Sequence, residues 1–398
     1  MAPTDLTRCV LTPRVATEGF EPIGIGVHRA STILFEDAAA YAERGERGEK
    51  GYSYGLYGTP TTRTLEEKLT QLEQAAGTFL APSGQAANAL AAVAFLNKGD
   101  HILLADTVYP PMRDFALSDL ARMGITLDFF DPTDLGDLEA RIRSETRLVW
   151  CESPGSTTME LMDIPAAAAL THEARALLAV DNTWATPLNL KPLALGADIV
   201  TEALTKYVSG HSDVLMGSIS VRDPDLAQPL KKMFGRFGIG ASPDDASLVL
   251  RGFETLGMRL RHCGAVAQRF AERLSGHRAI GRVLFPGLPT MAGHEIFKRD
   301  FLGSSGVFSL TFPECVAPHV WRALDHLSLF AIGASWGGTR SLAAPMSIGA
   351  SRSATRWQEP DVILRISIGL EDEGELWADL ERMLTALRRL SAAGDAAE

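Results

Sequence analysis

The segment Ala179–Asp213 places an acid and a lysine at the ends of neighbouring strands. An apolar run, Leu177–Val180, ends on Asp181, and a second strand-like run leads into Lys206. This pair suits a bound pyridine aldehyde, because the carboxylate can keep the ring nitrogen protonated and the amine can bond to the aldehyde carbon. A protonated ring can accept electrons from an attached substrate. The two residues therefore predict a site for pyridoxal 5'-phosphate.

Each residue alone allows a plainer interpretation. An aspartate after a strand often caps a turn, and a lysine in a loop is usually a solvated charge, which here could pair with Asp198 or Glu202. However, Lys206 is soon followed by a cluster of small and polar residues, Gly210–Asp213. Open α/β sheets bind ligands at the carboxyl ends of their strands. The clustering therefore favours a binding site over a solvated face.

A candidate phosphate site lies at another strand-to-helix turn, Ser83–Ala87. Ser83 can cap the helix, Gly84 permits close approach, and amides of the first turn are available to an anion. A capped helix without a ligand is the alternative. No G-K-[ST] or G-x-G-x-x-G motif is present there, so a single phosphate ester is favoured over a nucleotide. Tyr109, after the next strand, could stack on a ligand ring or be a half-buried loop aromatic.

Composition narrows the class of protein. The chain has 398 residues, of which 46% are hydrophobic and 22% charged, as is typical of a globular protein with a core. The net charge of −11 argues against nucleic acid or an anionic membrane as the partner. Four widely spaced cysteines indicate neither a zinc site nor a disulfide framework. No signal peptide or membrane-spanning run is recognisable, so we expect a cytoplasmic protein without a metal site.

The order of the expected elements gives an α/β fold. Residues 1–60 lack a sustained period and predict an extended arm. Residues 61–250 alternate helices with apolar strands, which predicts a mostly parallel sheet covered on both faces. Its first helix is expected to end at Gly77, and strands are expected at HILLAD, TLDFFD, RLVWCE, ALLAVD and ADIVTEA. Residues 251–398 contain most of a long amphipathic helix, two short strands and a terminal helix, which predicts a smaller α+β domain.

Ordered motifs extend this interpretation over nearly the whole chain. They are YGLYGTPT, ESPGSTTME, DNTWATPL, ALTKYVSGHSD, KRDFLGSSGVFS, SWGG and LRISIGLED. Together they resemble the Cys/Met-metabolism family of pyridoxal-phosphate enzymes, which have fold-type I. The resemblance implies a large cofactor-binding domain with a mostly parallel sheet, a smaller C-terminal α+β domain, and an arm that contacts a neighbouring subunit.

The resemblance also implies roles for individual residues. Lys206 would bond to the cofactor and move protons at the substrate Cα and the leaving sulfur. Beside it, Tyr109 would stack on the ring and Tyr54 would come from a neighbouring subunit. The other cofactor contacts would be Asp181 at the ring nitrogen, Gly84, Gln85 and Thr205 at the phosphate, and Thr183. The substrate would be held by Arg365 at its α-carboxylate and by Ser335, Trp336 and Ser156 in the pocket.

Two positions separate the branches of this family. The γ-acting members usually carry Asn-Pro after the E-S-P triplet and a glutamate before the S-x-G-G motif, where this chain has Gly155-Ser156 and Ala334. The resemblance therefore implies α,β-elimination of L-cystathionine, a sulfur amino acid, to homocysteine, pyruvate and ammonia in methionine biosynthesis. It also implies a homotetramer of two dimers. A broader cysteine-S-conjugate β-lyase, a γ-replacement or γ-elimination enzyme, and a non-catalytic relative are the alternatives.

Three residues depart from the pattern of the β-lyases. Leu56 stands where an arginine of the arm commonly reaches the cofactor phosphate of the neighbouring subunit, and Arg63 is a candidate substitute. Ala203 replaces a frequent serine three residues before the lysine, and Ala334 replaces a frequent tyrosine. We expect the first two changes to weaken cofactor binding and the third to widen the substrate pocket.

Overall fold

Residues 18–20, 22–47 and 51–394 are described by a computed structural model, and within them the chain forms one sheet of seven strands and another of five. The larger sheet has the order β1-β7-β6-β5-β4-β2-β3. Its strands are β1 (Gly77–Ala81), β2 (His101–Ala105), β3 (Thr126–Phe130), β4 (Thr146–Glu152), β5 (Leu177–Asp181), β6 (Ile199–Glu202) and β7 (Gly217–Val221).

The larger sheet is mostly parallel, as predicted. The pairs β2–β3, β2–β4, β4–β5 and β5–β6 are parallel, and β7 runs antiparallel to both of its neighbours. The five apolar runs expected to be strands are β2 to β6. Strand β7 (Gly217–Val221) was not predicted, because its sequence, GSISV, places buried serines where an apolar run would be the usual signal.

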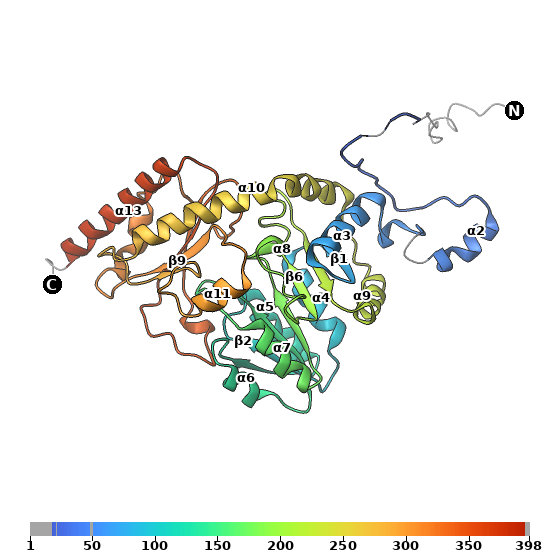
Figure 1. Ribbon diagram of the computed structural model, residues 1–398, viewed down its shortest axis with the longest axis horizontal. Helices are drawn as coiled ribbons and strands as arrows, with labels where there is room; N and C mark the ends of the chain where they lie inside the picture. The colour runs from blue at the N-terminus through green and yellow to red at the C-terminus, as the bar shows by residue number, and fades with distance from the viewer. Residues whose placement is uncertain (1–17, 21, 48–50, 395–398) are drawn as a thin grey trace.

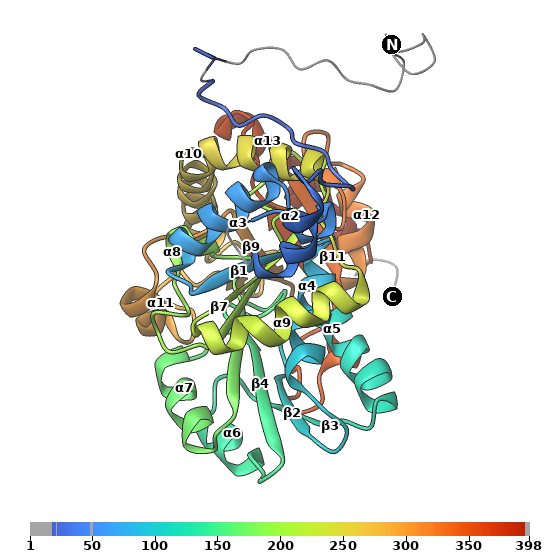
Figure 2. The same ribbon diagram turned by 90° about the vertical axis from the view of Figure 1, so that its right-hand side faces the viewer.

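Helices cover both faces of the larger sheet. Figure 2 shows α6 and α7 on one side of the strands and α4 and α5 on the other. The helices of this part are α3 (Pro60–Glu73), α4 (Gly84–Phe95), α5 (Pro110–Phe115), α6 (Leu135–Arg141), α7 (Ile164–Glu173), α8 (Thr186–Asn189) and α9 (Pro224–Phe237). The predicted end of the first helix at Gly77 is wrong. Gln74 ends α3 in the left-handed conformation, with φ of 57°, and Gly77 already begins β1.

The C-terminal part contains the smaller sheet, in the order β10-β11-β12-β9-β8. Helix α10 (Pro243–Leu274) runs along the molecule from the larger sheet toward this part (Figure 1). The remaining strands and α-helices are β8 (Val283–Leu284), α11 (His294–Asp300), β9 (Val307–Thr311), α12 (Val320–Leu324), β10 (Ala331–Ile332), β11 (Leu342–Met346), β12 (Ile363–Ser367) and α13 (Glu373–Gly394). The predicted boundary at residue 250 falls inside the unbroken helix α10, and the division into three domains stays a prediction.

The described part of the arm lies along the outside of the molecule. It contains α2 (Ala38–Ala42) and the short turns η1 (Glu43–Arg47) and η2 (Gly55–Tyr57), and it projects away from the body (Figure 1). Large apolar side chains such as Ile23 and Leu34 are exposed there. Residues 1–17 and 48–50 of the predicted arm lie outside the described residues. In the described part of the chain, no helix is long and apolar enough to cross a membrane.

Helix α10 fixes the turn that follows Lys206. Arg259 on α10 is buried and donates hydrogen bonds to the carbonyl oxygens of Tyr207, Gly252 and Val208, at 2.6, 2.7 and 3.3 Å. Gly252 lets the helix approach this turn, since a methyl group on it would lie 2.3 Å from the carbonyl oxygen of Ser209. The C-terminal half of the chain thus reaches back to position the lysine-bearing loop.

This close approach predicts opposite effects for two glycines of the same helix. Gly252→Ala should lower the free energy of unfolding by about 1–3 kcal/mol, because backbone atoms must move apart. Gly257→Ala is the matched control, since its added methyl group would lie 3.8 Å from a Leu188 methyl, an ordinary contact. That variant should gain up to about 1 kcal/mol from helix propensity. Denaturant unfolding measures both values, and equal effects of the two substitutions would contradict the close packing.

Candidate active site

Asp181 ends strand β5 as a buried carboxyl group fixed by three donors. Its Oδ1 accepts from the backbone N of Thr183 at 3.0 Å and from Thr183 Oγ1 at 2.5 Å, and its Oδ2 accepts from Asn88 Nδ2 at 3.0 Å. Burial raises the pKa of Asp181, while these hydrogen bonds and the charge of Lys206 act in the opposite direction. Thr183 Oγ1 also accepts from the backbone N of Ala203 at 2.8 Å. Thr183 thereby joins the ends of β5 and β6.

Lys206 lies on the loop between β6 and β7, with its amine pointing at the C-terminal part. Nζ donates to Ser335 Oγ at 2.8 Å and lies 5.4 Å from the centre of the Trp336 ring. Burial and the nearby guanidinium of Arg365 lower the pKa of Lys206 to about 8, although Asp181 opposes them. Roughly one amine in ten is then neutral at pH 7, whereas an ordinary lysine, with a pKa of about 10.4, is almost fully charged. A neutral amine can act as a nucleophile or a base.

Arg365 presents a buried positive charge beside this amine. It lies on β12, and its Nη2 donates to the backbone oxygens of Ala334 and Ser335, the latter at 3.4 Å. Burial lowers the pKa of Arg365, yet a guanidinium stays charged at neutral pH. Among the described residues no carboxylate forms an ion pair with it. A buried guanidinium without an acidic partner suits a ligand carboxylate.

Tyr109 and Glu152 form a further contact of the site, and Arg365 acts electrostatically on Tyr109. The backbone N of Tyr109, at the start of α5, donates to Glu152 Oε2 at 2.8 Å, while the phenol ring remains 42% exposed. Burial and the neighbouring charge of Asp181 raise the pKa of Glu152 well above its ordinary value. Burial also raises the pKa of Tyr109, together with the charges of Glu152 and Asp181, against the effect of Arg365. Tyr109 therefore lies within electrostatic reach of both the acid and the guanidinium.

The predicted phosphate residues meet at the start of α4. Ser83 Oγ caps the helix by accepting from the backbone N of Ala86 at 3.1 Å. A methyl group on Gly84 would lie 2.4 Å from the Cβ of Ala203, so the helix end and the loop before the lysine touch. Thr205 Oγ1 is held by the backbone N and O of Met216, at 3.0 and 3.2 Å. Gln85 Nε2 donates to the Pro111 carbonyl at 3.1 Å, and in the described chain its buried Oε1 has no donor.

Ser156 lies in a tight turn that contacts the Tyr109 loop. Its backbone N donates to the carbonyl of Thr107 at 2.8 Å, and its carbonyl accepts from the backbone N of Thr158 at 2.8 Å. A methyl group on the preceding Gly155 would lie 2.5 Å from the side chain of Thr107. This turn therefore needs glycine where it crosses the other loop, and it places Ser156 two residues from Tyr109 across the contact.

Within one chain, Tyr54 is not joined to the other predicted residues. It is 47% exposed and forms an isolated β-bridge with Thr32 of the arm. No hydrogen bond or ring contact among the described residues links it to Lys206. Arg63, the candidate substitute for Leu56, donates to the carbonyls of Gly51 and Tyr57 at 2.7 and 3.2 Å. The role of Tyr54 in a neighbouring subunit and that of Arg63 at a phosphate stay predictions.

Sequence reasoning missed two residues that fix the site. Asn88, which binds Asp181, lies one helical turn after Gly84 and is a buried polar residue in an alanine-rich helix. Glu152, which binds the backbone of Tyr109, ends β4 as Asp181 ends β5, and the two residues are register partners. A polar side chain in an apolar helix and a second acid at a strand end were the available signals.

The arrangement fits pyridoxal 5'-phosphate. Asp181 is buried and, in the described chain, receives hydrogen bonds from uncharged donors alone, so a cationic ring nitrogen would give it a positive partner. The start of α4 offers a capped helix end to a phosphate, close to the loop that carries the lysine. The lowered pKa of Lys206 provides an amine that can bond to an aldehyde near neutral pH. The three features lie on adjoining segments, since Gly84 approaches Ala203 closely and Asp181 acts electrostatically on Lys206.

The lowered pKa of Lys206 can be measured in the cofactor-free protein. Trace acetylation of Lys206, quantified by mass spectrometry, should rise with pH through a midpoint near 8, because the neutral amine reacts. Ser335→Ala should move this midpoint lower, since the ammonium form loses its hydrogen-bond acceptor. A midpoint above pH 10 in the unsubstituted protein would show that the amine is solvated and would contradict this geometry.

Comparisons with known proteins identify the family. Residues 7–385 match the family model described as "Cys/Met metabolism PLP-dependent enzyme". A putative cystathionine β-lyase of Rhizobium johnstonii is 41% identical over 364 residues, 90% of each chain. A cystathionine β-lyase of Escherichia coli K12 is 37% identical over 363 residues, which are 89% of this chain and 91% of that one.

A solved structure gives the same result for the fold. It is a cystathionine γ-synthase of Xanthomonas oryzae pv. oryzae in complex with aminoacrylate and cysteine, with a TM-score of 0.85 and 30% identity, and the match covers 94% of this chain and 95% of that one. The fold is therefore that of the fold-type I pyridoxal-phosphate enzymes, as predicted. The chain belongs to the Cys/Met metabolism family of PLP-dependent enzymes.

Proposed function

We propose that the protein is a carbon–sulfur lyase that performs α,β-elimination on L-cystathionine. The observation that carries the proposal is the half-buried amine of Lys206, which is hydrogen-bonded to Ser335 Oγ and close to the guanidinium of Arg365, with which no carboxylate of the described residues pairs. This arrangement places a base and a carboxylate-binding group side by side. Two relatives that are 37% and 41% identical are named as known or putative cystathionine β-lyases, which supports this substrate.

The reaction divides into tasks for these side chains. When bound, pyridoxal phosphate supplies an electron sink for the charge that develops at the substrate Cα. Arg365 holds the α-carboxylate through its planar fork. Nζ of Lys206 removes the Cα proton and then protonates the departing sulfur, so that homocysteine leaves as the Cβ–S bond breaks. Water converts the remaining three-carbon fragment to pyruvate and ammonia, which balances the reaction.

Surrounding residues keep these groups in place. Asp181 holds a negative charge at the buried end of the site, fixed by Thr183 and Asn88. Ser335 accepts a hydrogen bond from the ammonium form of Lys206 and so orients Nζ between its two proton transfers. Trp336 covers the amine on one side and excludes water.

A γ-acting enzyme is the second candidate. A cystathionine γ-synthase shares the fold at 30% identity, and Ala334, at the edge of the pocket, is exposed and leaves room for other substrates. A broader cysteine-S-conjugate β-lyase uses the same β-elimination and differs in the thiol that leaves. The keto acid product separates β- from γ-chemistry.

The products formed from L-cystathionine test the proposal. The purified protein loaded with pyridoxal phosphate should release pyruvate and homocysteine in equal amounts, and Lys206→Ala should lower the rate by at least about a thousandfold, because both proton transfers lose their carrier. Mass spectrometry of the released keto acid and thiol measures the two products and distinguishes them by mass. Release of 2-oxobutyrate and cysteine would contradict β-elimination. Unchanged activity of Lys206→Ala would contradict the role of the lysine.

The oligomeric state and the cellular compartment of the enzyme stay predictions. We propose a homotetramer of two dimers in the cytoplasm, in which Tyr54 of one subunit completes the site of its neighbour. The exposed apolar side chains of the arm support an interface on this side of the molecule.

A further inference from the structure

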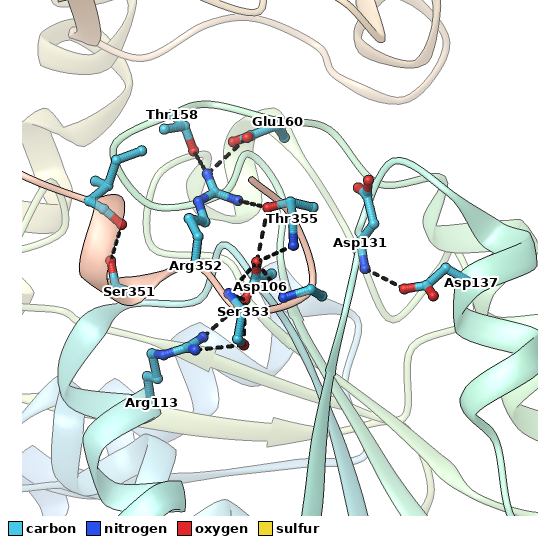
Figure 3. A network of polar contacts seen from close by, with 12 residues as sticks. Asp106, Arg113, Asp131, Asp137, Thr158, Glu160, Ser351, Arg352, Ser353 and Thr355 are labelled. Atoms are coloured by element: carbon cyan, nitrogen blue, oxygen red, sulfur yellow. Dashed lines mark hydrogen bonds and ion pairs between the residues drawn. The ribbon is translucent and has the colours of Figure 1, made fainter. Parts of the chain in front are cut away.

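Asp106 is a buried carboxylate that is absent from the chemistry proposed above. It directly follows β2, and it binds a loop that is about 250 residues further along the chain (Figure 3). Its Oδ2 accepts from the backbone N of Ser353, Ala354 and Thr355, at 3.0, 3.0 and 2.8 Å. The hydroxyls of Ser353 and Thr355 also donate to this carboxylate, at 3.1 and 2.9 Å. Three successive amides therefore converge on one anion.

Arg113 strengthens this contact. Its Nη1 donates to Asp106 Oδ1 at 3.0 Å and its Nη2 to Ser353 Oγ at 2.7 Å, while the guanidinium lies 3.6 Å from the centre of the Phe129 ring. Burial by itself would raise the pKa of Asp106, but the bonds from Thr355, Ser353 and Arg113 outweigh it and lower this pKa. Asp106 is consequently ionised at neutral pH, where its hydrogen bonds are charge-assisted.

Arg352 attaches the same loop to a second segment of the chain. Its side chain is buried and donates to Glu160 Oε1 at 2.8 Å and to Thr158 Oγ1 (Figure 3). Thr158 belongs to the turn that contains Ser156. The loop is therefore attached at one point to the segment that leads to Tyr109 and at another to the turn of Ser156.

The attached loop leads directly to the proposed substrate clamp. It covers residues 347–362 and joins β11 to β12, the strand that carries Arg365. Asp106 lies three residues before Tyr109, and Thr158 lies two residues after Ser156. We propose that Asp106, supported by Arg113 and Arg352, is a positioning residue. It holds the loops of Tyr109 and Ser156 in fixed relation to the Arg365 strand, so that the substrate binds between preformed walls.

This role predicts an effect on substrate binding rather than on proton transfer. Without the carboxylate, residues 349–357 gain freedom that must be lost again when a substrate binds, so KM should rise. The hydrogen bond from Lys206 to Ser335 and the electrostatic effect of Asp181 on Lys206 do not pass through Asp106, so kcat should change little. The predicted change in KM rests on the proposed function, whereas the attachment of the loop does not.

Asp106→Asn tests the inference in the cofactor-loaded protein. The substitution keeps the side-chain volume. It leaves a single oxygen acceptor for donors that bind two carboxylate oxygens in the unsubstituted protein. Trypsin cleavage after Arg352 and Arg356, which lie in the attached loop, should become at least about tenfold faster. KM for L-cystathionine should rise about tenfold with kcat within about threefold, and the absorbance of the bound cofactor should be kept. The double variant Ser353→Ala, Thr355→Val removes the two hydroxyl donors, together with the acceptor of Arg113 on Ser353, and should show the same changes more weakly.

Asp379→Asn is the matched control. Asp379 accepts from the backbone N of Ser328, Leu329 and Phe330, each at 2.9 Å, and from a hydroxyl and an arginine, Arg382. Asp379 accepts from the same kinds of donor as Asp106, but this carboxylate and its donors all lie in the C-terminal part of the chain. The control should lose stability without faster cleavage after Arg352 and Arg356 and without a change in KM.

Three results would overturn the inference. They are unchanged cleavage of the loop in Asp106→Asn, a fall in kcat at constant KM, and an equal rise of KM in the Asp379→Asn control. The proteolysis needs no substrate. A protein that releases no keto acid would therefore contradict the proposed function and still leave the loop attachment open to its own test.

Discussion

The partial burial of the Lys206 amine is the constraint on which the rest of the site depends. A lysine taken out of water loses much of the hydration that favours its charged form, and the nearby guanidinium of Arg365 adds to this penalty. The charge of the buried Asp181 and the hydrogen bond to the Ser335 hydroxyl partly offset this cost of holding a charged amine. The amine is therefore reactive near neutral pH and still ordered. Each of these groups comes from a different segment, which explains why the fold brings both halves of the chain to one place.

The two sheets have different tasks in this arrangement. The parallel strands β2, β4 and β5 end in Asp106, Glu152 and Asp181 or lead directly into them, and so gather acids at one edge of the larger sheet. The smaller sheet contributes the cation, Arg365, on a strand that is buried between two neighbours. Helix α10 and the loop of residues 347–362 then connect these parts. In the proposed reaction Asp181 faces the cofactor ring nitrogen and Arg365 holds the substrate carboxylate, so each sheet serves a different group of the bound ligands.

Strands β2 to β6 of the larger sheet could be predicted from the sequence, and Asp181 and Lys206 could be named from it as candidate site residues. Apolar runs that end in an acid are local signals, and so is the motif around Lys206. Strand β7 was not predicted because neighbouring strands bury its serines, and a polar residue type does not indicate burial in the sequence. The bonds of Asn88 and Glu152, and the three amides around Asp106, depend on tertiary contacts across up to 250 residues. No local pattern encodes such contacts. Tyr54 shows a further limit, since its proposed partner is another subunit.

The most direct test of the account is the position at which pyridoxal phosphate becomes permanently attached. Borohydride treatment of the loaded protein, followed by trypsin and mass spectrometry, identifies the modified lysine. The account predicts a single labelled peptide that spans residues 176–222, because a modified Lys206 is not cut and Lys191 precedes a proline. Label on other lysines, with residues 176–206 released unmodified, would contradict the central role of Lys206.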